Sequence, residues 1–221
     1  MLICNQKFTV VFLVLFFLLF KGFAQWGSDG SYFWSSNGIT YPINSKFELC
    51  FGNKDHYSNQ LKRLDYFHFE LIGYQKITSK FSLGLGLRQT ESYKSDKWNP
   101  GQTYMFYGVL YFTPFDIKIK FANRLTAKVS KITETQYGLD NISNIDFFTK
   151  SKSKLPKPYL MDEVFSNINV AKVQTIRIYS GFHVIKKEHW GIDFYYCYWQ
   201  SCPADEWKYY NVWGIVTKVR I

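Results

Sequence analysis

The sequence predicts an all-β protein, an antiparallel transmembrane β-barrel of about ten to twelve strands. Apolar and polar residues alternate with the two-residue period of a β-strand, and at the C-terminus one face holds Trp213, Ile215, Thr217, Val219 and Ile221. The alternating segments run for roughly 9–14 residues, which is enough to cross a bilayer at a tilt. Aromatic residues make up 20% of the chain. The aromatic girdles of membrane barrels account for such a share.

The N-terminus predicts a cleaved secretory signal peptide over residues 1–24. Lys7 precedes an apolar run at 8–20, and the Gly-Phe-Ala of 22–24 is a plausible cleavage site of small residues. Lys21 ends the apolar run, which is therefore shorter than the about 20 residues that a membrane-spanning helix needs. Because no other segment could span a bilayer as a helix, a membrane-embedded mature chain must be a closed barrel.

Ten alternating segments follow one another from residue 46 to the C-terminus, so 46–221 is expected to form one barrel domain. They cover residues 46–53, 64–77, 81–93, 103–113, 117–130, 145–152, 159–167, 173–186, 190–200 and 208–221. The N-terminal segment 25–45 contains a further candidate strand at 32–41. Single-chain bacterial barrels have an even number of strands, so ten or twelve are expected. The polar stretches between segments mostly alternate long and short, as the loops and turns of such barrels do.

The first three segments have a clear apolar face and a clear polar face. Their apolar faces hold Phe47, Leu49 and Phe51, then Phe67, Phe69 and Leu71, then Phe81, Leu83, Leu85 and Leu87. The glycines at 84 and 86 lie on the opposite face, where they relieve crowding inside a strand. Segment 103–113 follows a polar loop and ends at a turn that contains Pro114.

The later segments repeat this arrangement with more basic residues on the polar face. Segment 117–130 is the clearest, segment 145–152 is weaker, and 159–167 follows a turn at 156–158. Segments 173–186 and 190–200 are joined by a short turn at 187–189. Their apolar faces hold Ile176, Ile178, Phe182 and Val184, then Trp190, Ile192, Phe194, Tyr196 and Tyr198. Each apolar face is expected to meet lipid, and each polar face to look into the barrel.

The charge of the chain points to an anionic lipid surface or an anionic solute. The formal net charge is +10, and loss of Lys7 and Lys21 with the signal leaves about 10 − 2 = +8. Export argues against a nucleic-acid partner. The inward faces are expected to carry a charge network of Glu48, Arg88, Lys118, Lys120, Arg124, Glu163, Arg177, Asp193, Lys218 and Arg220. Such groups must pair or be hydrated, so the network either fills a closed lumen or lines a path for anions.

Two other functions remain open on the sequence. His68 and Glu70 lie two residues apart on one strand face, and Ser82 lies on the next strand. A histidine can activate a hydroxyl and a carboxylate can orient it, so this trio would suit a lipid-acyl hydrolase or transferase. The other alternative is an exported soluble β-barrel that binds a hydrophobic ligand. The leading expectation is a barrel without enzymatic activity.

Three cysteines, Cys50, Cys197 and Cys202, remain after cleavage of the signal. Cys197 and Cys202 could close a small loop, or all three could be free thiols. Their spacing matches no zinc pattern, so neither a metal nor another cofactor is expected.

Motifs near the seventh and eighth segments resemble a bacterial family of small outer-membrane barrels of unknown function. The similarity lies in Glu163, Phe165 and Asn167 (E-x-F-x-N), followed by Gln174, Arg177 and Gly181 (Q-x-x-R-x-x-x-G). The resemblance implies that Arg124, Glu163, Asn167 and Arg177 lie on the lumen side, and it implies no activity. We therefore expect an uncharacterised, porin-like protein of a Gram-negative outer membrane, either structural or permeable to small anions or solutes. Its expected partners are outer-membrane lipid, lipopolysaccharide and, through the C-terminal strand, the barrel-assembly machinery.

Overall fold

The computed structural model describes residues 30–58, 62–130, 134–148, 155–202 and 205–221. The predicted signal peptide lies outside these residues. Among them, no helix is long and apolar enough to cross a membrane.

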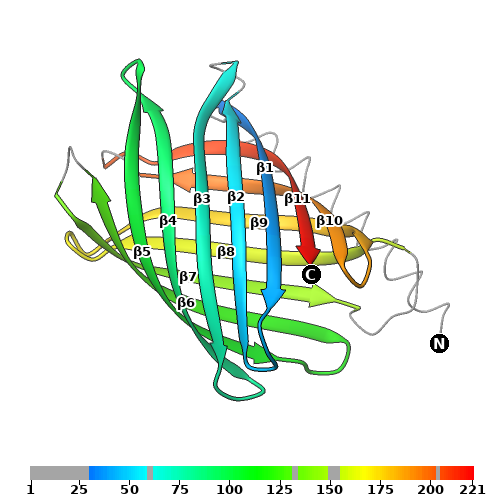
Figure 1. The fold of residues 1–221 in the computed structure, drawn as a ribbon. Coiled ribbons are helices and arrows are strands. Elements are labelled where there is room, and N and C mark those ends of the chain that lie inside the picture. The colour runs from blue at the N-terminus through cyan, green and yellow to red at the C-terminus, as the bar shows by residue number, and fades with distance from the viewer. Residues whose placement is uncertain (1–29, 59–61, 131–133, 149–154, 203–204) are drawn as a thin grey trace.

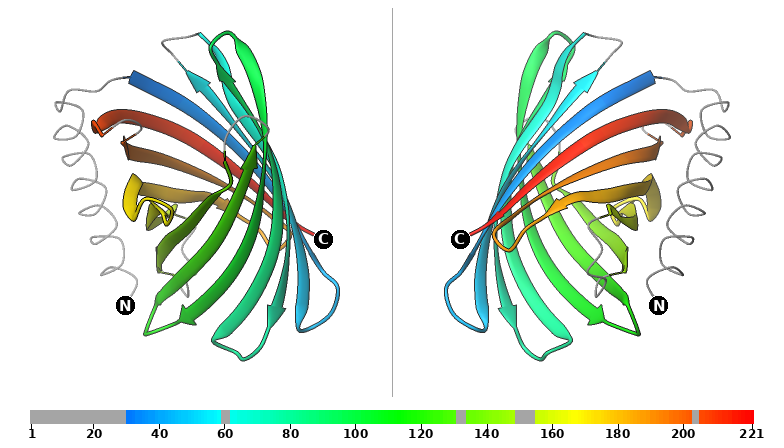
Figure 2. Two further views of the ribbon diagram at one scale, coloured as in Figure 1. Left: turned by 90° about the vertical axis from the view of Figure 1, so that its left-hand side faces the viewer. Right: turned by 90° about the vertical axis from the view of Figure 1, so that its right-hand side faces the viewer.

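The described residues form a closed barrel of eleven strands (Figure 1). The strands are β1 (Gly30–Pro42), β2 (Phe47–Ser58), β3 (Arg63–Lys76), β4 (Phe81–Lys94), β5 (Lys97–Phe112), β6 (Ile117–Ser130), β7 (Gln136–Phe147), β8 (Lys157–Asn167), β9 (Lys172–Lys186), β10 (Trp190–Ser201) and β11 (Lys208–Arg220). Each strand pairs antiparallel with its neighbours in sequence. Figure 2 shows the strongly tilted strands of the cylinder from two further sides.

The strand count corrects the expectation of ten or twelve. The ten strands predicted from residue 46 onward are present, and the candidate at 32–41 is β1. The total of eleven is possible because β1 and β11 close the barrel in parallel, from Gly30 opposite Tyr210 to Thr40 opposite Arg220. An even number is required only when every pair around a closed barrel is antiparallel.

Several predicted loops are strands, and the predicted alternation of long and short connections is wrong. β2 continues to Ser58 and β5 begins at Lys97. β7 covers Gln136–Phe147, whereas the sequence suggested 145–152, and residues 149–152 lie outside the described part of the chain. Polar residues occupy both faces of these stretches, so the two-residue pattern disappears there. Apart from 148–156, the connections are short at both ends of the barrel.

The two faces of the barrel wall agree with the predicted alternation. Outward side chains are apolar and exposed, as Leu85 (68%), Trp213 (53%) and Leu71 (51%) illustrate. Inside, one buried cluster gathers around Trp34 and Tyr179, and another gathers around Tyr107 and Val109. The apolar surface is therefore turned outward, and the interior is a mixture of aromatic and charged groups.

The outer wall has a few polar exceptions, which bond to one another. The amide of Asn37 donates to Oδ1 of Asn53 at 3.1 Å, and Asn53 donates to Asp55 at 3.1 Å. On the other side of the barrel, Asn141 donates to Oδ1 of Asn123 at 3.0 Å. Each pair satisfies part of its own hydrogen-bonding capacity, which lowers the cost of placing an amide among apolar neighbours.

Candidate functional site

The candidate site is a cavity of about 810 Å³ inside the barrel. It reaches from Lys94, the last residue of β4, to Lys218, close to the end of β11 at the opposite mouth. Two further cavities of about 640 and 370 Å³ share lining residues with it, including Arg124 and Glu163 respectively. The interior is therefore hollow over much of its length.

Basic side chains outnumber acidic ones around this cavity. Eight lysines and arginines line it, against three aspartates and glutamates. The cations are Lys54, Arg88, Lys94, Lys120, Arg124, Lys128, Arg177 and Lys218, and the acids are Asp65, Glu70 and Glu163. A concave site lined mainly by one sign of charge concentrates ions of the opposite sign. The lining of this cavity therefore carries an excess of positive charge.

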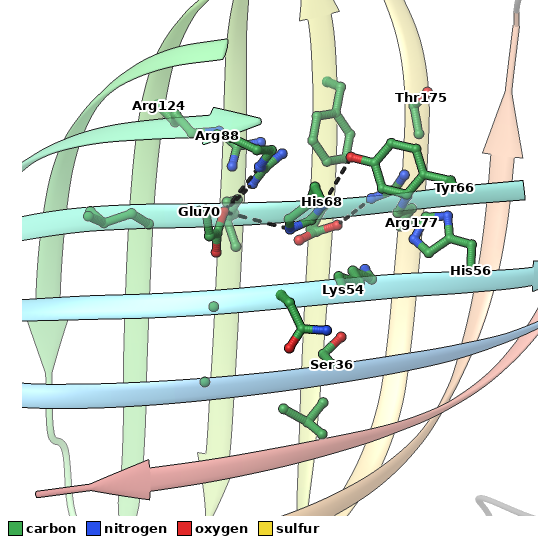
Figure 3. Close-up of a pocket in the computed structure, with 18 of the residues that line it drawn as sticks. Ser36, Lys54, His56, Tyr66, His68, Glu70, Arg88, Arg124, Thr175 and Arg177 are labelled. Atoms are coloured by element: carbon green, nitrogen blue, oxygen red, sulfur yellow. Dashed lines mark hydrogen bonds and ion pairs between the residues drawn. The ribbon is translucent and has the colours of Figure 1, made fainter. Parts of the chain in front are cut away.

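One charge group joins β3 and β4 (Figure 3). Arg88 donates from Nε (3.0 Å) and Nη2 (2.7 Å) to Oε2 of Glu70. Nε2 of His68 lies 3.8 Å from the same carboxylate oxygen, and Nδ1 of His68 shares a 2.9 Å hydrogen bond with the hydroxyl of Tyr66. Because Glu70 and Arg88 are direct partners in the strand register, the sheet itself positions this pair.

Two further arginine–carboxylate pairs lie deeper in the lumen. Arg124 of β6 donates from Nε to Oδ2 of Asp140 of β7 at 2.9 Å, and both side chains are less than one-tenth exposed. Arg177 of β9 donates from Nη1 to Glu163 of β8 at 3.1 Å, and the Tyr179 hydroxyl donates to the same oxygen at 2.7 Å. Each pair again consists of register partners, so neighbouring strands cross-link inside the barrel.

A charge group centred on His183 lies toward the mouth of the barrel at which β11 ends. Nδ1 of His183 is 2.7 Å from Asp193, and Nε2 of His183 is 3.3 Å from Asp146. Lys218 donates to the other oxygen of Asp193 at 2.5 Å. The ring of Tyr159 stacks on His183 with 4.8 Å between centroids. This group connects β7, β9, β10 and β11 across the lumen.

The remaining predicted charges lie near the mouths or have no ion-pair partner. Arg220 and Glu48 form a 3.5 Å pair that is largely exposed. Nζ of Lys118 lies 5.8 Å from the ring centroid of Tyr111. Lys120 faces the cavity, and no carboxylate of the described residues lies within 4.0 Å of it. Seven of the ten predicted network residues line the cavities, whereas Glu48, Lys118 and Arg220 line none of the three.

One ion pair lies at the mouth where β9 begins. Lys172 donates a hydrogen bond to Asp205 in the connection between β10 and β11. This hydrogen bond and the positive charge of Lys172 lower the pKa of Asp205 below its ordinary value. The pair ties the start of β9 to that connection.

The structure does not assemble the predicted hydrolase trio. His68 pairs with Thr90 of β4, whereas Ser82 pairs with Lys76. His68 and Lys76 are eight positions apart along β3, which places Ser82 about 25 Å from His68. Glu70 is held by Arg88, and the ring of His68 is held by Tyr66. His68 and Glu70 are together, as the sequence indicated, but without the nucleophile.

The sequence did not reveal three residues of the cavity wall, Lys54, His56 and Trp199, or the fully buried Trp34 beside them. Lys54 and His56 fell in a predicted loop, and Trp34 and Trp199 lie on inward rows whose neighbours are mixed in polarity. The only signal was the continuation of the β2 period past Phe51, which puts even-numbered residues inside. Nζ of Lys54 lies 4.0 Å from the ring centroid of Trp34.

The cysteines do not form disulfides in the structure, and no metal site is evident in the part of the chain that it describes. Cys50, Cys197 and Cys202 are all free thiols, so the possible Cys197–Cys202 pair does not form. No group of three or more His, Cys, Asp or Glu side chains in that part could hold a metal ion.

Fold and site together define the chain as a closed, mostly antiparallel β-barrel with a basic interior. Residues 32–210 match the model of a family described as protein of unknown function (DUF2490). The chain belongs to this family, and the resemblance to a family of unknown function is confirmed. No curated protein matches the chain. Arg124, Glu163 and Arg177, which the resemblance placed on the lumen side, line the cavity, and Asn167 lines the adjoining one.

Proposed function

We propose that the protein is an outer-membrane β-barrel, exported behind a signal peptide at residues 1–24, whose lumen admits small anions. The observation that carries the proposal is the cavity of about 810 Å³ with eight basic and three acidic lining residues. An excess of fixed positive charge attracts anions into a narrow polar space and opposes the entry of cations.

The outer surface supports a membrane location. Exposed apolar side chains recur on outward positions around the barrel, among them Phe51, Leu71, Leu85, Phe106 and Trp213. Soluble monomers rarely expose apolar patches larger than a few hundred Å². A bilayer would cover this surface, whereas a water-soluble ligand-binding barrel would leave it in contact with water.

The proposed partners follow from the same location. Outer-membrane lipid and lipopolysaccharide would contact the outward rows and the basic residues near the mouths, such as Lys62, Lys97 and Lys187. We propose that the barrel-assembly machinery binds the C-terminal strand β11 through its apolar outward face. A lipid-acyl enzyme gains no support, because Ser82 is remote from His68.

A planar-bilayer recording of the purified, refolded protein tests the conduit. Under a potassium chloride gradient, we expect a reversal potential of the sign set by chloride. Lys120→Gln and Lys128→Gln together should shift that potential toward zero, because both lysines line the cavity and neither forms an ion pair among the described residues. Lys80→Gln, in the turn between β3 and β4, is the matched control and should leave the potential unchanged.

The same protein tests the location. Heat-modifiable mobility in membrane fractions that require detergent for extraction would support a membrane barrel. Recovery of the folded protein in the detergent-free soluble fraction would overturn it. A folded barrel that inserts but never conducts would reject the conduit and leave a structural role.

A further inference from the structure

An unusual group of nitrogen atoms gathers on one side of the lumen, on side chains from β1, β2, β9 and β10. Four buried nitrogens have no hydrogen-bond partner among the residues that the structure describes: Nε1 of Trp34, Nε1 of Trp199, Nε2 of His56 and Nε of Arg177. Buried polar groups are nearly always hydrogen-bonded, so four such atoms in one place need a cause. We call these four residues, together with Lys54, the donor cluster.

The members of the donor cluster contact one another through their rings and charges. The imidazole of His56 stacks on Trp34 with 4.2 Å between centroids. The guanidinium of Arg177 lies 4.9 Å from the ring centroid of Trp34 and 5.4 Å from that of Trp199. Figure 3 shows Lys54, His56 and Arg177 around the same part of the cavity. These three residues and Trp199 all line the cavity.

Carboxylates are scarce beside the donor cluster. No carboxylate among the described residues lies within 4.0 Å of Lys54, whose ammonium lies over the face of Trp34. Glu163 bonds Arg177 only through Nη1, and it also accepts a hydrogen bond from Tyr179. The guanidinium Nε of Arg177 and the ammonium of Lys54 therefore keep donor capacity that no side chain in the described part of the chain uses.

The chemistry of the cluster selects the kind of ligand. Lysine, arginine and the indole nitrogen are donors only, so the missing partner must be rich in acceptors. A water molecule also needs acceptors for its own two hydrogens. A carboxylate or phosphate group offers several lone pairs and a negative charge, and charge-assisted hydrogen bonds to it are the strong ones.

We propose that the donor cluster is a binding site for the carboxylate or phosphate group of a small molecule that enters the lumen. Lys54 and Arg177 supply charge and hydrogen bonds, His56 and Trp199 supply further contacts, and Trp34 supports Lys54 from behind. The inference shares with the proposed function only the need for a lumen that solutes can reach. It goes further, because it places a saturable site where a conduit alone needs none.

Calorimetric titration of the detergent-solubilised, refolded protein tests the site with two probes, sodium phosphate and sodium benzoate, and with neutral benzyl alcohol as the control. We expect saturable binding of at least one anion and none of the alcohol. Binding of benzoate alone identifies a carboxylate site, and binding of phosphate alone identifies a phosphate site. Saturable binding of neither anion overturns the proposal.

Lys54→Gln and its matched control locate the binding. Lys54→Gln removes a charge without leaving an unpaired acid, and it should weaken binding by about tenfold or more, the size of one hydrogen bond to a charged group. Lys80→Gln, in the turn between β3 and β4 and outside the cavity, should stay within about twofold of the unmodified protein, because it removes no hydrogen bond to the ligand. Heat-modifiable mobility shows that each variant is folded. Equal affinities for Lys54→Gln and the unmodified protein would overturn the site.

A second readout uses Trp199 itself. Anion binding should change the intrinsic fluorescence, and Trp199→Phe should remove most of that change while the other six of the seven tryptophans remain. Saturable binding in a barrel that does not conduct would reject the proposed function and keep this site. Conductance without saturable anion binding would reject this site and keep the proposed function.

Discussion

The Arg124–Asp140 pair gives a stability prediction that depends directly on its burial. Nε of Arg124 donates to Oδ2 of Asp140 at 2.9 Å, Nη2 forms an ion pair with the same oxygen at 2.8 Å, and the side chains are 6% and 7% exposed. Asp140→Asn keeps the shape and an acceptor oxygen but removes the negative charge. The arginine then stays in the barrel without a counter-ion, next to the Tyr107 hydroxyl, to which Nη1 donates at 3.3 Å.

The expected cost of Asp140→Asn is about 3 kcal/mol, the lower end of the range for breaking a buried ion pair by removing one partner. The lower end applies because the amide oxygen still accepts one hydrogen bond. That cost lowers the folding equilibrium constant by roughly 150-fold. Urea unfolding in detergent micelles, followed by tryptophan fluorescence and by heat-modifiable mobility, measures it.

Two controls separate burial from charge. Glu48→Gln breaks the ion pair between Glu48 and Arg220, in which the Glu48 side chain is 36% exposed and the Arg220 side chain 57% exposed. This substitution should cost less than about 1 kcal/mol of stability. Replacing both members of the buried pair, as Arg124→Met with Asp140→Leu, should recover most of the loss, because no uncompensated charge remains. Equal costs for Asp140→Asn and Glu48→Gln would refute the reasoning, since burial would then make no difference.

Two further predictions concern packing inside the wall and the cysteines. Gly181→Ala should destabilise the barrel by about 1–3 kcal/mol, because its Cβ would lie 2.5 Å from Cζ of Tyr159. Gly38→Ala, whose Cβ would find its nearest neighbour at 4.0 Å, should cost nothing in the same urea titration, and equal losses would contradict the packing argument. A water-soluble maleimide should modify Cys50, which lines the cavity, and spare the fully buried Cys197 until urea is added. Mass spectrometry of the labelled protein checks this, and rapid labelling of Cys197 in the folded barrel would contradict it.

The alternation of residues predicted the wall of the barrel wherever one face is apolar. β6 has the predicted bounds, 117–130, because lysines and an arginine face apolar residues along its length. β2 and β7 were cut short, because Asn53 and Asn141 put polar groups on the outer face and removed the contrast between faces. The parallel closure of β1 on β11 depends on a contact between the two ends of the sheet, and no local pattern encodes it.

The candidate site was predictable by face and not by partner. Arg88, Arg124 and Arg177 were placed inside because each lies on the polar side of its strand. Which carboxylate faces each arginine is set by the strand register. The register depends on turns and bulges, which the alternation of residues does not reveal. The donor cluster was missed because its members are separated by more than 160 positions in the chain, from Trp34 to Trp199, and the barrel brings them together.

Because β1 and β11 run in the same direction, the polypeptide enters the barrel at one mouth and leaves it at the other. In a bilayer, whatever precedes Gly30 and whatever follows Arg220 would then belong to different aqueous compartments. For a barrel inserted in an outer membrane, one of two epitopes placed before β1 and after β11 should therefore be accessible on intact cells, and the other only after the membrane is permeabilised. Such a barrel could connect the cell exterior with the space beneath the membrane through its own chain ends, which an even-stranded barrel with both ends on one side cannot do.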